Sequence, residues 1–141
     1  MVRISYSAPD DIELAGTKGD FAALWAELQS FLSAANETAK VPADPDFDPA
    51  PYETRLDAIE FRCSGGPNNV SVGGDVLRVT GSNENLALFG SWLDFERATA
   101  PQHSHYEYYD GNQWVAPDSL PLVISLERDA PYNKAMKSDV E

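Results

Sequence analysis

The chain has few of the residues that build disulfides, metal clusters and anion-binding surfaces. Its 141 residues include one cysteine and two histidines, and 10 Lys and Arg stand against 23 Asp and Glu. A single cysteine excludes an internal disulfide and every metal motif that needs a cysteine pair. The net charge of −13 repels phosphate backbones and anionic lipid headgroups. We therefore expect neither nucleic acid nor a membrane as a partner.

Long hydrophobic runs are also missing. No stretch of about 18 apolar residues could cross a bilayer, and the segment from Met1 to Gly16 has no apolar run like that of a signal peptide. The lone Cys63 suits a reducing compartment, so the sequence predicts a cytoplasmic protein. The hydrophobic content of 43% is enough for one globular domain with its own core.

The spacing of apolar residues predicts two helices and several strands. Apolar residues recur at helical spacing over 20–35, and Asp20 follows Thr17 by three residues, as in a capping box. A second helix is predicted over 83–99, with Leu88 and Trp92 widening its apolar stripe until it is buried around much of its circumference. Strands are predicted at 2–7, in three runs between 56 and 80, at 103–109 and at 121–127.

The resulting order, β-α-β-β-β-α-β-β, predicts one α+β domain over 1–128, with two helices packed on one face of a mostly antiparallel sheet. The runs between 56 and 80 should form an antiparallel meander, because Gly73, Gly74 and Asp75 form a hairpin signal between two of them. The tail at 129–141 has no periodicity and is expected to be loosely ordered.

A proline-rich acidic segment at 40–53 interrupts this pattern. Its prolines prevent a helix or a central strand, so a loop is predicted. Acidic and aromatic side chains alternate in it, which suits protein recognition because aromatic rings supply contact area and prolines reduce the entropy lost on docking. The candidate partner-binding residues of this loop are Asp44, Asp46, Phe47, Asp48 and Tyr52. The alternative is an acidic connector without a partner.

The stretch HSHYEYYD, from His103 to Asp110, holds both histidines of the chain. In an extended strand His103 and His105 point to one face, and Tyr106 and Tyr108 point to the other. Two imidazoles about 6.5–7 Å apart can converge on one zinc ion, but the chain has no further His and no Cys pair to complete a site. We therefore expect no metal and no cofactor. A small metal-binding or ligand-binding domain that uses this strand remains the alternative.

Motifs for catalysis are absent from the sequence. Ser104 and Ser119 lie outside any Gly-x-Ser-x-Gly elbow, and the Gly-containing segments 64–69 and 72–75 fit hairpin turns better than a phosphate loop. No enzymatic activity is predicted.

The segment 76–127 is similar to a family of small bacterial immunity proteins that neutralise polymorphic toxins. The similarity lies in a strand that ends in Gly, a Leu-rich helix, a His-x-His strand and a final strand introduced by Ser and a Leu-Val/Ile pair. The matching positions are Gly81, Leu86, Leu93, His103, His105, Ser119, Leu122 and Ile124. This resemblance implies tight, non-enzymatic binding of one cognate toxin domain in the cytosol.

The charge of the chain agrees with such a role. Toxin enzymes often have cationic clefts, and an acidic inhibitor can occupy such a cleft in place of the substrate. We expect a basic toxin domain to contact the acidic loop together with the 103–110 strand, the latter through His103, His105, Tyr106 and Tyr108. The alternative for the histidines is a structural role, in which they fasten the last two strands and contact no partner.

Overall fold

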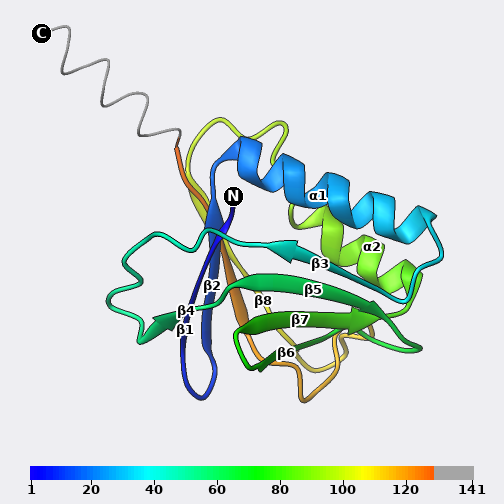
Figure 1. Ribbon diagram of the computed structural model, residues 1–141. Helices are drawn as coiled ribbons and strands as arrows, with labels where there is room; N and C mark the ends of the chain where they lie inside the picture. The colour runs from blue at the N-terminus through cyan, green and yellow to red at the C-terminus, as the bar shows by residue number, and fades with distance from the viewer. Residues whose placement is uncertain (129–141) are drawn as a thin grey trace, which may run out of the picture.

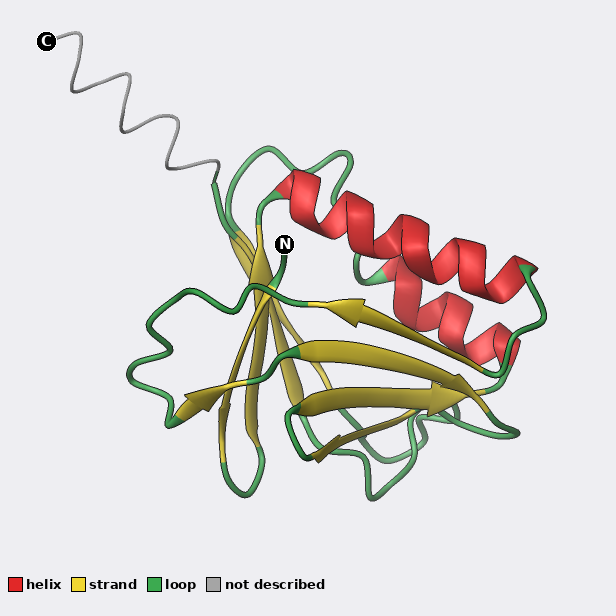
Figure 2. Ribbon diagram, in the orientation of Figure 1, coloured by secondary structure: helices red, strands yellow, loops and turns green. Residues whose placement is uncertain are grey.

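The structure is a computed structural model that describes residues 1–128, and these residues form two helices and two β-sheets (Figures 1 and 2). The elements are β1 (Arg3–Ser7), β2 (Asp11–Gly16), α1 (Lys18–Ser33), β3 (Thr38–Pro42), β4 (Thr54–Arg55), β5 (Ala58–Cys63), β6 (Asn69–Gly73), β7 (Val76–Gly81), α2 (Asn83–Ser91), β8 (Gln102–Tyr106) and β9 (Leu122–Leu126). The tail at 129–141, for which we expected loose order, lies outside the described residues.

The α+β class is confirmed, but the single sheet that we expected is wrong. Sheet A has the strand order β4-β1-β2-β9-β8, with β2 and β9 parallel and the other pairs antiparallel. Sheet B has the order β3-β5-β7-β6, with β5 and β7 parallel. Both helices cover the same face of sheet B (Figure 2), and sheet A stands beside this layer pair. One hydrophobic core contains side chains from both sheets and both helices.

Three strands lie outside the predicted set, so the order becomes β-β-α-β-β-β-β-β-α-β-β. β2 alternates buried Ile12 and Leu14 with more exposed acidic residues, a period-2 pattern that fits a strand with one face on the core. β3 takes the first residues of the proline-rich segment, which we expected to be loop throughout. Pro42 is tolerated there because β3 is an edge strand. β4 is only two residues long.

The antiparallel meander expected for 56–80 is also wrong. The hairpin of β6 and β7 is confirmed, and Gly74 turns it with a φ of +61°. β7 nevertheless lies between β6 and β5 and runs parallel to β5, so β6 is at the edge. This order aligns Ile59 with Leu77 and Phe61 with Val79, all fully buried. The two most apolar strands therefore occupy the centre of sheet B, where burial is greatest.

The first helix is confirmed together with its capping box, in which Thr17 and Asp20 each accept a hydrogen bond from the other's backbone N–H. The second helix ends at Ser91, earlier than the expected 99. The Asp94 side chain accepts a hydrogen bond from the N–H of Glu96 at 3.1 Å, and such a local turn competes with helical continuation. Leu88 and Trp92 are exposed, so α2 is buried on one side only and the wide apolar face that we expected is wrong.

The segment 114–120 runs along the outer edge of β6. The N–H of Asn68 donates to the carbonyl of Trp114 at 2.7 Å, and the N–H of Leu120 donates to the carbonyl of Val70 at 2.9 Å. The hydroxyl of Ser119 accepts a hydrogen bond from the N–H of Val70 at 2.8 Å. This edge of sheet B is therefore covered by the chain itself.

Asn68 is fully buried where this segment meets β8 and α2. Its Nδ2 donates to the hydroxyl of Tyr106 at 2.8 Å and to the carbonyl of Asn85 at 2.6 Å. Its Oδ1 lies against Gly81, where an added Cβ would be 2.0 Å away. Only glycine therefore fits at position 81.

The solvent-facing side of sheet B carries an ion pair. Arg78 on β7 donates a hydrogen bond to Glu60 on the neighbouring β5, and Arg62 lies 3.5 Å from the same carboxylate. The hydrogen bond from Arg78, with the positive charges of both arginines, lowers the pKa of Glu60 below its usual range. A carboxylate with a lowered pKa stabilises the fold at neutral pH and loses this contribution in acid.

The variant Glu60→Gln should therefore be less stable than wild type at pH 7, by about 0.5–1 kcal/mol as for other partly exposed pairs. The difference should vanish as the pH falls through the lowered pKa of Glu60, since both side chains are then neutral. Urea unfolding at pH 7 and pH 3 measures this. Glu27→Gln, on the exposed side of α1, is the control. An equal loss at both pH values would contradict the role of the charge.

Candidate functional site

The face of sheet A that points away from the core is polar, and we call it the outer face of sheet A. Cross-strand pairing places Arg3, Ala15, Ser125 and His103 in one row across four strands. The next row contains Glu13, Val123 and His105, with Ser125 donating a hydrogen bond to Glu13 at 2.7 Å. Both histidines are exposed at the β8 end of this face, whereas Ala15 nearer its middle is buried.

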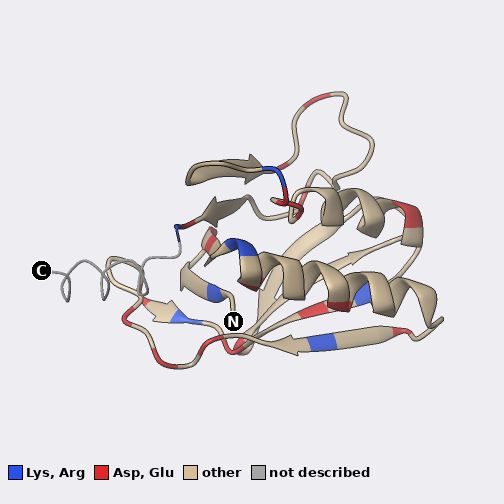
Figure 3. Ribbon diagram, turned by 90° about the horizontal axis from the view of Figure 1, so that it is seen from above, with Lys and Arg blue, Asp and Glu red and all other residues tan. Residues whose placement is uncertain are grey.

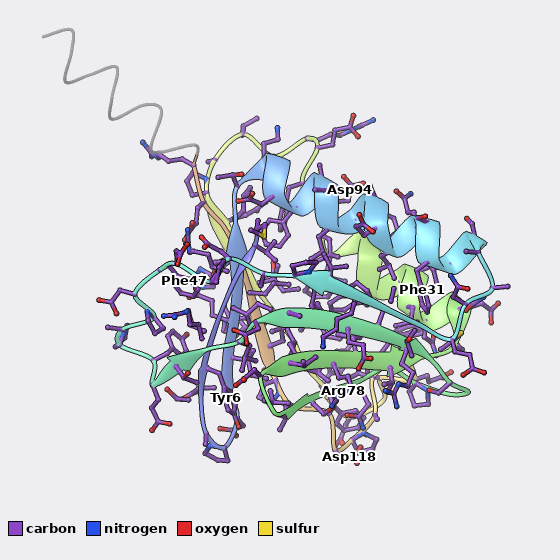
Figure 4. All side chains as sticks on the ribbon, in the orientation of Figure 1. Tyr6, Phe31, Phe47, Arg78, Asp94 and Asp118 are labelled. Carbon is purple, nitrogen blue, oxygen red and sulfur yellow. The ribbon has the colours of Figure 1, made fainter. Side chains whose placement is uncertain are left out.

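The acidic loop, residues 43–53, lies against the other end of this face, beside β1 and β4. The Phe47 ring covers the guanidinium of Arg3 at 5.6 Å, and the Arg55 Nη1 donates to the carbonyl of Phe47 at 3.1 Å. Figure 4 shows Phe47 beside the strands of sheet A. Arg3 also donates to Glu127, and this hydrogen bond is the main cause of its raised pKa. Phe47 is thus held by the sheet and is half-buried.

The aspartates of the acidic loop have two kinds of role. The Asp44 side chain accepts from the N–H of Asp46 at 2.8 Å, and the Asp48 side chain accepts from the N–H of Ala50 at 3.0 Å. These local turns shape the loop. Asp46 and Asp48 are exposed and Asp44 is half-buried. Figure 3 shows acidic segments along the loop between β3 and β4. The carboxylate of Asp46 is the one most available to a partner.

Tyr52 is half-buried at the end of the acidic loop. Burial raises its pKa, and the negative charges of Glu13 and Asp11 on β2 raise it further. Phe47 and Tyr52 are thus both half-buried, and they offer a partner less free surface than their position in a proline-rich loop suggested.

His103 and His105 are exposed, with ring centroids 5.5 Å apart in an edge-to-face arrangement. Residues 1–128 contain no group of three His, Cys, Asp or Glu side chains that could hold a metal ion. The hydroxyl of Ser119 accepts a hydrogen bond from the N–H of Val70, and no hydrogen bond of either imidazole is found within the described residues. The imidazoles are therefore available to solvent or to a partner.

The tyrosines of this strand lie differently from our expectation. Tyr106 is 4% exposed, and burial raises the pKa of its phenol. Its ring packs edge-on against Phe89 at 5.0 Å and Trp92 at 5.3 Å, so it belongs to the core. Tyr106 cannot serve as the exposed aromatic contact that we expected, and Tyr108 is only half-exposed beyond the end of β8.

Beside β8 lies a hollow that sequence patterns did not reveal, which we call the aromatic groove. It has a volume of about 360 Å³ between the end of α2 and the loop 107–115. Its exposed apolar side chains are Leu88, Trp92, Tyr109 and Trp114, which are 45%, 39%, 61% and 49% exposed. Within residues 1–128, Met1 is the one other large apolar residue whose side chain is exposed. Such clustering marks a binding surface more often than scattered exposure does.

The polar lining of the aromatic groove includes one carboxylic acid residue and no Lys or Arg of the described chain. His105 and Glu107 contribute to it from β8 and its extension, and Ser91 and Asn112 contribute from the two other walls. A positively charged group that enters the groove would therefore meet aromatic residues and one acidic residue, Glu107. No Lys or Arg of the described chain already occupies the groove.

No helix within residues 1–128 is long and apolar enough to cross a bilayer. Comparisons with protein-family models, with curated proteins and with solved structures found no match to this chain.

Proposed function

We propose that this chain is an immunity-type protein that binds a basic toxin domain and blocks its active site without catalysing a reaction. The observation that carries the proposal is the aromatic groove, in which four large exposed apolar side chains surround an opening that no described cationic side chain lines. Exposed Trp and Tyr rings supply most of the energy in protein interfaces. The net charge of −13 and the resemblance of 76–127 to immunity proteins support a basic partner.

The binding surface that we propose extends from the aromatic groove across the outer face of sheet A to the acidic loop. Four interstrand spacings of roughly 4.8 Å separate β8 from β4, or about 19 Å. An interface of ordinary size, about 800 Å² on each partner, covers that width. His103 and His105 lie within this footprint, and Asp46 lies at its far end. Tyr106 contributes only as a buried support beneath the groove.

A second candidate function is the binding of a small molecule in the same groove. Its volume of about 360 Å³ is within the range of small-molecule pockets. This alternative would need only the groove, whereas toxin neutralisation also uses charge along the outer face of sheet A. Salt dependence therefore separates the two.

The test is co-expression of this chain with a toxin domain encoded beside it. Growth should be rescued, and in stopped flow the association rate should fall steeply with salt, because the Debye length shrinks from about 10 Å at 0.1 M to about 3 Å at 1 M. Trp114→Ala should speed dissociation about 30-fold, the equivalent of about 2 kcal/mol. Asp46→Asn should slow association and flatten its salt dependence.

Lys40→Ala, on the exposed side of β3, is the control for these variants and should leave the binding rates unchanged. Thermal melts check that each variant is folded, and the backbone hydrogen bond from Asn68 to residue 114 does not depend on the tryptophan ring. Toxicity that persists despite folded protein would overturn the proposal. If growth is rescued but the association rate does not depend on salt, the chain inhibits the toxin without electrostatic attraction between the two proteins.

A further inference from the structure

The two sheets have four edges, and three of them are protected against pairing with another strand. β4 is two residues long, which is too short to template a partner. β3 carries the charged Lys40 and ends in Pro42, both of which discourage pairing at an edge. β6 is covered by the segment 114–120 through backbone hydrogen bonds.

β8 is the remaining edge, and it has none of these protections. Its five residues, Gln102–Tyr106, include no Lys, no Pro and no acidic side chain. Among residues 1–128 it pairs with β9 alone, so one side of its backbone has no partner strand. Gln102, His103 and His105 are exposed along it. An unprotected edge of this length is a template for an added strand.

The aromatic groove opens directly beside this edge. His105, Tyr106 and Glu107 form one of its walls, and they belong to β8 and the residue after it. Side chains of an added strand alternate between the two faces of the sheet, so one that projects on the Tyr106 side enters the groove. There it meets the groove that Trp92, Trp114 and Glu107 line. Aromatic faces beside a carboxylate favour a cationic side chain, Arg above all.

We propose that a basic extended segment of the partner adds to β8 as a sixth strand of sheet A and places an Arg or Lys side chain in the aromatic groove. This inference rests on the proposed function and specifies how the partner binds. Charge identifies the occupant. A second copy of this chain would carry the same net charge of −13 and would be repelled, whereas a basic segment is attracted.

The experiment uses a short probe peptide, Ac-Thr-Val-Arg-Val-Thr-amide, titrated into the ¹⁵N-labelled protein. The backbone amides of 102–106 and the indole N–H signals of Trp92 and Trp114 should shift together. Trp25, which packs between the helices against Gly90, is the internal control and should not move. The same peptide with citrulline, the neutral isostere of Arg, should bind about five-fold more weakly.

Two further arms separate the charge from the strand pairing. Glu107→Gln should reduce the preference for Arg over citrulline, and the exposed position of Glu107 makes a folding defect unexpected. A peptide with alternate backbone N-methyl groups cannot complete a ladder and should shift neither the β8 amides nor the indoles. Equal binding of the Arg and citrulline peptides, equal binding of the N-methyl peptide, or no shift at millimolar peptide would overturn the proposal.

The last measurement is made on the protein without peptide. Concentration-dependent shifts of the β8 amides, with a dimer in sedimentation, would show a second copy on the edge and would also overturn the proposal. If toxin neutralisation is observed without peptide binding, the inference fails while the proposed function stands. If the peptide binds but no toxin is neutralised, the proposed function fails and β8 remains a strand-binding edge.

Discussion

Gly90→Ala is expected to destabilise the fold by about 3 kcal/mol, the upper end of what an extra methyl group costs in a tightly packed interior. Gly90 is buried in α2 where this helix packs against Trp25 of α1. A Cβ at this position would lie 1.9 Å from Cζ3 of Trp25 and 2.6 Å from two further atoms of the same ring. The indole cannot shift by that amount without moving the helices apart, so the melting temperature should fall by about 10 °C.

The matched control is the same substitution in the other helix. Gly19 is exposed in the first turn of α1, and an added Cβ would meet nothing closer than the Thr17 hydroxyl at 3.8 Å. Gly19→Ala should therefore stabilise the protein by up to about 1 kcal/mol, because alanine has the higher helix propensity. Adding Trp25→Leu to Gly90→Ala should recover most of the loss. Equal effects of the two Gly→Ala changes would contradict the close helix contact.

Asn68→Ala is expected to cost a similar amount, about 3 kcal/mol. The substitution leaves the Tyr106 hydroxyl and the Asn85 carbonyl without their buried hydrogen-bond donor, and it opens a cavity beside Gly81. The Asn68 Oδ1 accepts no hydrogen bond from any residue between 1 and 128, so the cost arises from the lost Nδ2–H donor and from the lost volume. Denaturant unfolding measures the loss.

The adjacent Asn69 provides the comparison, because its side chain donates only to exposed Asp118 at 3.0 Å. Asn69→Ala should change stability by no more than about 0.5 kcal/mol. Tyr106→Phe should cost less in the Asn68→Ala background than in wild type, since the hydrogen bond is then already absent. Additive losses in this cycle would show that the Asn68–Tyr106 bond contributes little.

The elements that the sequence predicted best are those that depend on local interactions. The capping box at Thr17, the apolar period of α1 and the hairpin at Gly74 each involve residues close together in the chain, and all three are present. The strand that contains Ile12 and Leu14 had the same kind of alternating signal, and it could have been predicted.

The errors concern pairings between distant segments. The hairpin signal pairs β6 with β7 but does not say which of the two lies beside β5, and only the greater burial of β7 in the folded sheet separates them. The division into two sheets likewise depends on how apolar faces are shared across the core. Period-2 alternation correctly placed the histidines and Tyr106 on opposite faces of β8, but it cannot tell which face is buried when both carry ring side chains.

The candidate site also depends on segments that are far apart in the sequence. The aromatic groove is assembled from α2, from the end of β8 and from the loop around Trp114, three segments with no shared motif. Leu88 and Trp92 were expected to widen the apolar stripe of the second helix and to be buried with it, but both are exposed. Trp92 is the C-cap residue of this helix, which ends at Ser91, and a local turn at Asp94 follows it.

The position of β9 in sheet A has a consequence for the order in which a ribosome can let this protein fold. Sheet B and both helices are complete in the chain once Ser91 has been made, but β9 lies between β2 and β8 and is the last of the described strands. At about 5–20 residues per second, the hairpin of β1 and β2 waits several seconds for its neighbour. Until Leu122–Leu126 emerges, β2 and β8 both remain unpaired on that side, and a nascent chain halted earlier would leave two open strand edges for a chaperone to shield.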